Sequence, residues 1–401
     1  MRERVLILGA GIQGISCALS LSAKGYAVTL IDKDEEPFSG TSFRNEGKIH
    51  LGFVYANDHS FQTSALMLEG AMNFGLLVEN WVGRPVNWSS LRSSPFQYAV
   101  HQQSMVSEAA LLSHYQTLQN AYETYRNAGF HYVGSCPQKL WASPQVVNSP
   151  INPSIIQSII PTEEIAINLK RLRQLLRHAL KRRGVQFLGN RVVHSVERSS
   201  FGFCVKGSQA DGTDWRAEGG LVVNCLWASR LAVDATLGIM PLRPWVYRLK
   251  FRMLGQLPPE LATMQSYTVA LGPFGDIVTY QNDLTYVSWY PSCMRGWSDA
   301  LQPPAEWEPF CREEQVLTDH PWVQDALGEL NELIPGMNQF QIQHLSAGVI
   351  FSWGETDIDQ PESLLHQRNQ IGIEAFDGYF SINTGKLTTA PLFAHQLAQQ
   401  L

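Results

Sequence analysis

A glycine-rich turn near the N-terminus constrains the fold of this chain more than any other feature. An apolar run from Val5 to Leu8 leads into the string Gly9-Ala10-Gly11-Ile12-Gln13-Gly14, which opens a helical pattern that stops at Gly25. In a G-x-G-x-x-G turn between strand and helix, the first glycine permits the tight turn, the second lets a pyrophosphate approach the backbone, and the third lets helix and strand pack closely. The helix N-terminus attracts phosphate oxygens. The sequence therefore predicts a βαβ unit that binds a dinucleotide.

The end of the second strand supports this interpretation. A second apolar run, Val28 to Ile31, ends at Asp32 and Lys33. Asp32 follows the last glycine of the turn by about twenty residues, which is the position where a carboxylate hydrogen-bonds a ribose hydroxyl.

A small, polar segment follows the βαβ unit and contains three glycines. It reads Gly40-Thr41-Ser42-Phe43-Arg44-Asn45-Glu46-Gly47-Lys48-Ile49-His50-Leu51-Gly52. Backbone that passes close to a flat cofactor requires such residues, although on composition alone an ordinary polar loop explains them equally well.

Two motifs give the chain a family resemblance. Gly40-Thr41-Ser42-x-Arg44 and Lys48-Ile49-His50-x-Gly52 resemble the corresponding segment in FAD-dependent oxidoreductases of the D-amino acid oxidase superfamily, nearest to the glycerol-3-phosphate dehydrogenase and L-2-hydroxyglutarate oxidase branch. Near the C-terminus, Gly385-Lys386-Leu387-Thr388-Thr389 is similar, residue for residue, to a string of the glycerol-3-phosphate enzymes. The return strand of the superfamily usually ends Asn-Ala-x-Gly, whereas this chain has Asn224-Cys225-Leu226-Trp227, which puts the close cofactor approach at that glycine in doubt.

The resemblance implies an α/β fold with two domains. A discontinuous FAD-binding domain of the Rossmann type would comprise residues 1–60, 155–238 and 346–401. A substrate domain of the α+β class, built on a mostly antiparallel sheet, would comprise residues 61–154 and 239–345. The residue pattern agrees, because leucines at helical spacing before Gly184 are followed by short strands at 185–188, 192–196, 201–205 and 221–224.

The cofactor contacts expected from the motifs and the resemblance form one set. Val193 is included because a backbone turn near it should contact the adenine, and residues 385–389 because their amides and the helix that follows would face the flavin. The full set is Gly9, Gly11, Ile12, Gln13, Gly14, Asp32, Lys33, Gly40, Thr41, Ser42, Arg44, Asn45, Gly47, Val193, Asn224, Gly385, Lys386, Leu387, Thr388 and Thr389. We expect the FAD to be bound non-covalently, because Arg44 stands where some superfamily members carry a flavin-linked histidine.

Three residues are candidates for catalysis. His50 is the candidate base, since the ordinary pKa of histidine suits proton removal near neutrality. Arg368, expected on a strand, is the candidate for binding a carboxylate. The third candidate, Lys48, either lies near the flavin or points to solvent.

One departure from the resemblance concerns the substrate. The glycerol-3-phosphate enzymes carry a Gly-Leu-Arg-Pro string with a substrate-binding arginine, and this chain has Gly348-Val349-Ile350-Phe351 in its place. Because that arginine is missing, a phosphorylated polyol is an unexpected substrate.

An alternating strand offers a second charged surface. Between Trp245 and Arg252 the apolar residues face one way, while Arg248, Lys250 and Arg252 face the other, where they either form the floor of a pocket for an anionic substrate or meet water. The aromatic residues of 277–280 and 284–290 either pack in a core or form a wall over the flavin.

Composition excludes several classes of protein. The net charge of −6 provides no basic surface for nucleic acid. The six cysteines lie far apart without C-x-x-C spacing, and no apolar stretch is long enough to span a membrane, so a cytoplasmic protein is expected.

The expected function is that of an FAD-dependent oxidoreductase. A small hydroxy acid, amino acid or amine would transfer hydride to flavin N5, and oxygen or a quinone would reoxidise the flavin. The alternative is an FAD-binding scaffold or regulatory subunit of a redox complex without turnover of its own.

Overall fold

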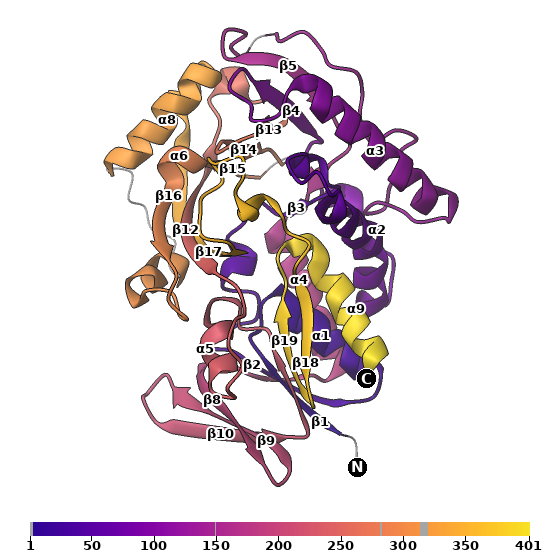
Figure 1. Ribbon diagram of the computed structural model, residues 1–401, viewed down its shortest axis with the longest axis vertical. Coiled ribbons are helices and arrows are strands. Elements are labelled where there is room, and N and C mark those ends of the chain that lie inside the picture. Colours follow the sequence, from indigo (N-terminus) through magenta and orange to yellow (C-terminus); the bar gives the residue numbers. More distant parts are fainter. Residues whose placement is uncertain (1–2, 149, 281–282, 313–319) are drawn as a thin grey trace.

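The computed structural model describes residues 3–148, 150–280, 283–312 and 320–401. Residues 281–282 and 313–319, which belong to the expected substrate domain, lie outside the described residues. Figure 1 shows a six-stranded sheet in the lower half of the molecule and an eight-stranded sheet in the upper half.

The N-terminal βαβ unit forms as expected. Strand β1 (Arg4–Leu8) pairs in parallel with β2 (Ala27–Ile31), and α1 (Ile12–Ala23) connects them. A Cβ atom on Gly14 would lie 1.8 Å from the carbonyl oxygen of Gly9, so this close packing of helix against turn is open only to glycine.

The six-stranded sheet has the order β18-β19-β11-β1-β2-β7. Strands β7 (Gln186–Leu188), β11 (Leu221–Asn224) and β19 (Tyr379–Asn383) run parallel to their neighbours β2, β1 and β11, while β18 (Gly372–Phe376) is antiparallel to β19. Strands β8 (Arg191–Ser199), β9 (Gly202–Gln209) and β10 (Asp214–Gly219) form a separate antiparallel sheet. The strands expected at 185–188, 192–196, 201–205 and 221–224 are therefore confirmed as β7, β8, β9 and β11, and β10 completes a three-stranded meander between β7 and β11.

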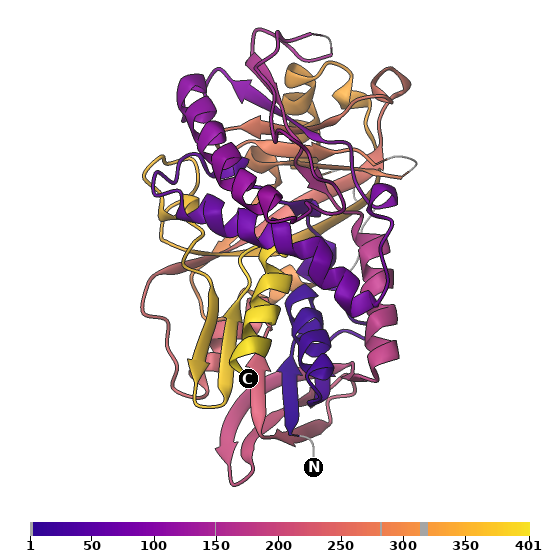
Figure 2. The ribbon, with the colours of Figure 1, turned by 90° about the vertical axis from the view of Figure 1, so that its right-hand side faces the viewer.

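Several helices cover the side of the molecule that faces the viewer in Figure 2. Besides α1 and the shorter α9 (Ala390–Gln400), they include α2 (Gln62–Val82) and α4 (Leu169–Arg183), and α9 packs against both α1 and α2. In α4 the expected leucine stripe is buried, the Asn168 side chain caps the first turn, and Gly184 ends the helix in a left-handed conformation.

Five further helices are described. They are α3 (Glu108–Asn127), α5 (Arg230–Ala235), α6 (Tyr290–Cys293), α7 (Glu308–Arg312) and α8 (Pro321–Leu333). None of the helices described is long and apolar enough to cross a membrane.

The second sheet is mostly antiparallel, as expected, with the order β16-β12-β15-β14-β13-β4-β5 and β17 paired to β12. Only the pair of β13 and β4 is parallel among its described pairs. The strands are β4 (Phe96–His101), β5 (Ile156–Pro161), β12 (Trp245–Gln256), β13 (Ser266–Ala270), β14 (Gly275–Val278), β15 (Thr285–Trp289), β16 (Met294–Ser298) and β17 (Gln341–Trp353). A short ribbon of β3 (Lys48–Ile49) and β6 (Ile165–Ala166) lies between the two sheets.

Two of the expected domain boundaries differ from the sheet pairing. Strand β5 and most of β17 were assigned to the FAD-binding domain, within 155–238 and 346–401, yet both pair in the eight-stranded sheet. A short apolar strand carries no signal for which sheet it joins, because that choice depends on pairing partners far away in sequence.

Candidate functional site

A cavity of about 480 Å³ lies between the two sheets and receives side chains from both. Its lower part is lined by the glycine turn and the segments at the carboxyl ends of β1, β2 and β11, which is where open α/β sheets bind their ligands. Its upper part is lined by the charged face of β12, by residues of β14 and β15, and by the loop before β18.

The glycine turn leaves room for a pyrophosphate. A Cβ atom on Gly11 would lie 2.9 Å from Ser42 Oγ, which accepts a hydrogen bond from the Ile12 N–H at 2.9 Å. Asp32 accepts hydrogen bonds from the backbone N–H groups of Ala10 and Asp34, and burial raises the pKa of its carboxyl group to about 6. The turn, the free helix end and this carboxylate fit the diphosphate and ribose of a dinucleotide.

Most of the expected cofactor residues line this cavity. They are Gly9, Gly11, Ile12, Gln13, Asp32, Lys33, Gly40, Thr41, Ser42, Arg44, Asn45, Gly385, Lys386 and Leu387. The others, Gly14, Gly47, Val193, Asn224, Thr388 and Thr389, are not among its lining residues. Val193 is instead packed in a hydrophobic cluster with Val196 and Phe203, because β8 turns this side chain toward the sheets.

Trp227 stands where the superfamily usually has the glycine of its Asn-Ala-x-Gly string, and its backbone adopts a conformation that glycine favours. Trp227 has a φ of +54°, in the left-handed region that a bulky residue seldom adopts, and its Nε1–H donates to Val349 O at 2.7 Å. Asn224 is buried, and its side-chain amide donates to Asp234 Oδ1 at 2.8 Å and to Tyr379 Oη at 2.9 Å. Asn224 therefore holds the strand in place, while Trp227 lines the cavity.

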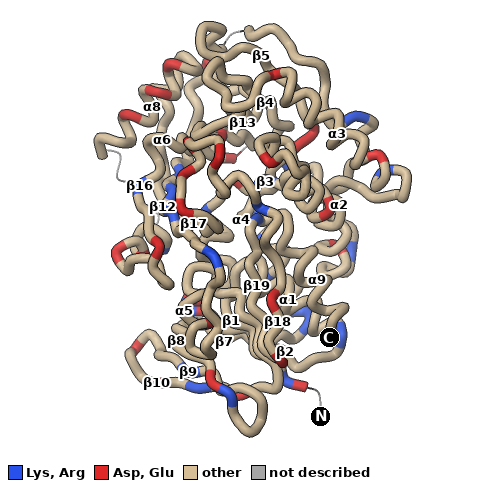
Figure 3. The backbone as a smooth tube through the Cα atoms, viewed as in Figure 1, with Lys and Arg blue, Asp and Glu red and all other residues tan. Residues whose placement is uncertain are grey.

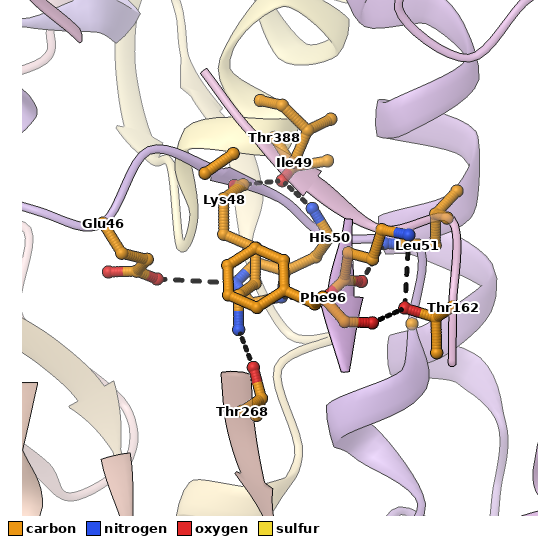
Figure 4. A network of polar contacts seen from close by, with 12 residues as sticks. Glu46, Lys48, Ile49, His50, Leu51, Phe96, Thr162, Thr268 and Thr388 are labelled. Carbon is orange, nitrogen blue, oxygen red and sulfur yellow. Dashed lines mark hydrogen bonds and ion pairs between the residues drawn. The ribbon is translucent and has the colours of Figure 1, made fainter. Parts of the chain in front are cut away.

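The two motifs from opposite ends of the chain meet beside the cavity (Figure 4). Thr388 Oγ1 accepts a hydrogen bond from His50 N–H at 2.8 Å and donates to Lys48 O at 3.4 Å. Thr389 Oγ1 donates to Thr384 O at 2.6 Å, which fixes the turn before α9. Thr388 and Thr389 thus hold the strand that presents Lys48 and His50.

His50 lies between two carboxylates. Its Nε2 is 3.7 Å from Glu46 Oε1, and its Nδ1 is 3.9 Å from Glu164 Oε1. Burial lowers the pKa of His50; Glu46 and Glu164 oppose this effect, and Lys386 and Lys48 add to it. Burial alone would raise the pKa of Glu46, yet the nearby His50, Lys386 and Lys250 hold it well below its usual range. The imidazole is therefore neutral near neutral pH.

Lys48 points away from solvent, into the eight-stranded sheet. Its Nζ donates to Thr268 Oγ1 and to Asp276 Oδ1, both at 2.6 Å, and lies 4.0 Å from the centre of the Phe96 ring. Although burial lowers the pKa of Lys48, Asp276 and the other nearby carboxylates outweigh it and hold this pKa above its ordinary value. Lys48 is thus a charged group with a fixed partner.

Two guanidinium groups meet at the upper end of the cavity. Arg248 Nη2 donates to Ser352 Oγ at 2.9 Å, and Arg368 Nη1 donates to the same Oγ and to Phe351 O. Arg248 Nη1 also contacts Tyr290 Oη at 2.7 Å and Asp357 Oδ1 at 3.2 Å. Burial and the charge of Arg248 lower the pKa of Arg368 to about 10, so the Arg368 guanidinium is still charged at neutral pH.

The structure settles where the charged face of β12 lies. Arg248 and Lys250 line the cavity, Arg252 is buried, and Figure 3 shows these basic positions in blue along β12. Arg368 lies in the loop before β18 and not on a strand. Ile350, which stands in place of the arginine of the Gly-Leu-Arg-Pro string, pairs across the strands with Arg248, so a guanidinium still reaches this surface from the neighbouring strand.

Comparison with known proteins identifies the family. A family model described as FAD dependent oxidoreductase (DAO) matches residues 4–400. The chain belongs to this family. The protein is accordingly an FAD-dependent oxidoreductase with an α/β fold, as its motifs and the cavity that fits a dinucleotide predict.

Solved structures share the DAO fold over the whole chain. Glycine oxidase from Geobacillus kaustophilus has 15% identity and a TM-score of 0.65 over 99% of this chain and 94% of that chain. A glycerol-3-phosphate dehydrogenase from Bacillus halodurans, complexed with FAD, has 14% identity and a TM-score of 0.57 over 100% of this chain and 64% of that chain. Identities this low establish the fold and nothing finer.

A curated relative matches only a short segment. A D-amino acid dehydrogenase of Chromohalobacter salexigens is 42% identical over 50 residues, which is 12% of this chain and 12% of the relative. The chain therefore covers a small part of that relative's length, and its activity is not transferred by this match.

Sequence reasoning missed several residues that face the site. Tyr55 lines the cavity, and Glu46 stood inside the quoted motif string without being assigned a role. Glu164 is a single carboxylate between two short strands, and nothing in the sequence around it indicates that it lies near the site. Only the pairing of β3 with β6 brings Glu164 beside His50.

The attachment of FAD can be tested at Arg44. The guanidinium of Arg44 donates to the carbonyl oxygens of Ser39 and Arg312, where a histidyl linkage would need an imidazole. Acid precipitation of the holoenzyme should therefore leave a colourless pellet and a yellow supernatant. A yellow pellet after washing would contradict non-covalent binding.

Proposed function

We propose that this protein oxidises a small amino acid, or a related amine that carries a carboxylate, with FAD as the first electron acceptor. The observation that carries the proposal is the pair of guanidinium groups of Arg248 and Arg368 at the end of the FAD cavity that also contains His50.

The charges near the two arginines favour an anionic ligand. Two guanidinium groups share Ser352 Oγ, and Asp357 accepts hydrogen bonds from Arg248 and Tyr290. Among the described residues, the hydrogen-bond acceptors of Arg368 are the neutral oxygens of Phe351 and Ser352, so its positive charge has no carboxylate hydrogen-bonded to it as a counter-charge. A substrate carboxylate would supply it through the fork of the Arg368 guanidinium.

His50 and Tyr55 provide the polar groups between the arginines and the rest of the cavity. The two rings lie 5.6 Å apart, and neither the His50 ring nitrogens nor Tyr55 Oη has a hydrogen-bond partner among the described residues. Burial raises the pKa of Tyr55, which keeps its hydroxyl protonated and able to donate. Buried polar groups of this kind are ready to bind a polar ligand.

The chain's own residues account for the proton transfer. An amino acid enters as an ammonium ion, and neutral His50 removes one of its N–H protons, which leaves a lone pair on the nitrogen. Bound FAD supplies the two-electron oxidation of the adjacent C–H bond. Arg368 and Arg248 hold the carboxylate, so the carbon that loses hydrogen is fixed relative to His50.

The comparisons support an amine over a hydroxy acid. The curated relative is a D-amino acid dehydrogenase, and the structural neighbours include a glycine oxidase. Oxygen or a quinone would reoxidise the flavin. The imine product would hydrolyse to an oxo acid and ammonium.

An anaerobic screen tests the proposal. Purified holoenzyme is mixed with D- and L-amino acids, N-substituted glycines, hydroxy acids and simple amines, and the flavin absorbance is followed. Bleaching by an amino acid supports the proposal. Bleaching only by hydroxy acids would contradict the substrate class, and no bleaching by any compound would favour the non-catalytic alternative.

Arg368→Lys is expected to weaken substrate binding more than it slows reduction at saturation. The lysine keeps the charge but loses the two-pronged hydrogen bonding, which is worth about 1.5–3 kcal/mol, or roughly 10–100-fold in the apparent Kd. Anaerobic stopped-flow reduction over a range of substrate concentrations separates the two effects.

The matched control is Arg198→Lys, because Arg198 on β8 forms an exposed ion pair with Asp377. It should overlay the wild type. An unchanged Kd in Arg368→Lys would remove this residue from the site.

A further inference from the structure

Glu164 is the most deeply buried carboxylate near the site, and the residues that line the cavity do not include it. Its Oε2 accepts a hydrogen bond from Leu51 N–H at 2.6 Å, and its Oε1 accepts one from Tyr98 Oη at 2.6 Å. Burial and the neighbouring Glu164 raise the pKa of Tyr98 well above its usual value, so Tyr98 keeps its proton and donates it. Two short hydrogen bonds thus fix both carboxylate oxygens in place.

The two carboxylates on either side of His50 are in different surroundings. Glu46 lines the cavity on the Nε2 side, where Lys386 and Lys250 also act on it. Glu164 lies on the Nδ1 side, away from the cavity, with its side chain fully buried. A neutral imidazole carries one proton, and the nitrogen that holds it faces the group that accepts a hydrogen bond best.

We propose that Glu164 is the positioning residue of His50: the carboxylate attracts the Nδ1–H, so that the lone pair of Nε2 faces the cavity as the base. The separation of 3.9 Å is longer than a hydrogen bond, and hydrogen bonds of catalytic groups are often long before the substrate is bound. The Leu51 and Tyr98 hydrogen bonds hold the carboxylate in place. This inference rests on the proposed role of His50.

Other charged groups near His50 do not replace Glu164 in this role. Lys48 is an ammonium ion bound to Asp276, and an ammonium ion cannot accept the Nδ1–H. Burial lowers the pKa of Lys386 to about 8, so at neutral pH its amino group is mostly protonated and cannot accept this hydrogen bond either. Tyr55 packs against the ring, and its hydroxyl is a donor. Glu46 faces the opposite nitrogen.

The first test is Glu164→Gln in the holoenzyme. The amide keeps the size of the side chain and an oxygen for the Leu51 N–H, but it removes the negative charge. Flavin reduction at saturating substrate should slow about 10–100-fold with little change in substrate Kd, as when outer partners of a functional histidine are lost. Because an anion raises the pKa of a nearby imidazole, the acid limb of the rate profile should move to lower pH.

Tyr98→Phe is expected to shift the acid limb in the opposite direction, and it provides a second test should Glu164→Gln fail to fold. It leaves Glu164 in place but removes the hydrogen bond to Oε1, the oxygen nearest to His50 Nδ1. The carboxylate then acts more strongly on the imidazole, so the acid limb should move to higher pH. Glu163→Gln, at the exposed neighbouring position, should leave the limb where it is.

A measurement that needs no substrate separates this inference from the proposed function. In protein labelled with ¹⁵N-histidine, the His50 signals are those missing from His50→Asn. The neutral wild-type ring should carry its proton on Nδ1, and Glu164→Gln should shift the proton toward Nε2. The same tautomer in both proteins would overturn the role of Glu164, and so would acid limbs that coincide in Glu164→Gln and wild type. Failure of every substrate to reduce the flavin would instead overturn the proposed function alone.

Discussion

Gly11→Val is expected to give a folded protein that purifies without FAD. Gly11 has a φ of −70° and a ψ of −175°, extended backbone that any residue adopts, so the substitution does not strain the main chain. Its side chain, however, would enter the space between the helix end and Ser42, where even a Cβ atom lies 2.9 Å from the hydroxyl oxygen. The pyrophosphate would lose its close approach to the α1 N-terminus.

The expected loss of FAD affinity is at least about 100-fold, or about 2.8 kcal/mol. It is measured by absorbance of the purified protein and by titration of the apoprotein with FAD, with circular dichroism to confirm the fold. Gly328→Val is the matched control, because a Cβ atom there meets no other atom within 4 Å. A yellow Gly11→Val protein with wild-type affinity would contradict the cofactor site.

His50→Asn is expected to slow anaerobic flavin reduction by about 10²–10⁴-fold while FAD stays bound. The asparagine amide keeps polarity at the position but cannot take up a proton. In the wild type only the neutral imidazole acts as a base, so reduction is fast above the pKa of His50 and falls as the pH drops through it. Because burial lowers this pKa, the acid limb should lie below the ordinary value of about 6.5.

The control for this variant is His194→Asn, which removes an exposed histidine hydrogen-bonded to Ser208 on the three-stranded sheet. Its reduction rate and pH profile should match those of the wild type. If His50→Asn also reduced at the wild-type rate across the pH range, the base would have to be another group, and Glu46 would be the first to examine.

Local patterns predicted the parts of the fold that depend on short stretches of chain. The βαβ unit, the leucine stripe of α4 and the meander of β8, β9 and β10 formed as expected, since periodicity and turn residues specify them directly. The motifs at 40–52 and 385–389 predicted two ends of one site, and the hydrogen bond from His50 to Thr388 is where they meet.

The remaining features depend on which distant strands pair. Arg248 reaches the site because β12 lies beside β17, and Glu164 reaches His50 because β6 pairs with β3. No single-strand pattern contains these registers, and for the same reason the ranges expected for the FAD-binding domain took in β5 and most of β17, which pair in the eight-stranded sheet. The expected contact of the backbone near Val193 with the adenine stays a prediction, while the Val193 side chain packs in a hydrophobic cluster.

The carbon that is oxidised in this cavity should carry both an amino group and a carboxylate. A single anaerobic turnover measures this: an excess of holoenzyme is mixed with the amino acid that bleaches the flavin, and the products are quantified. We expect one ammonium ion and one oxo acid for each flavin reduced. Bleaching without ammonium release, or with a hydroxy acid as the only effective donor, would contradict it.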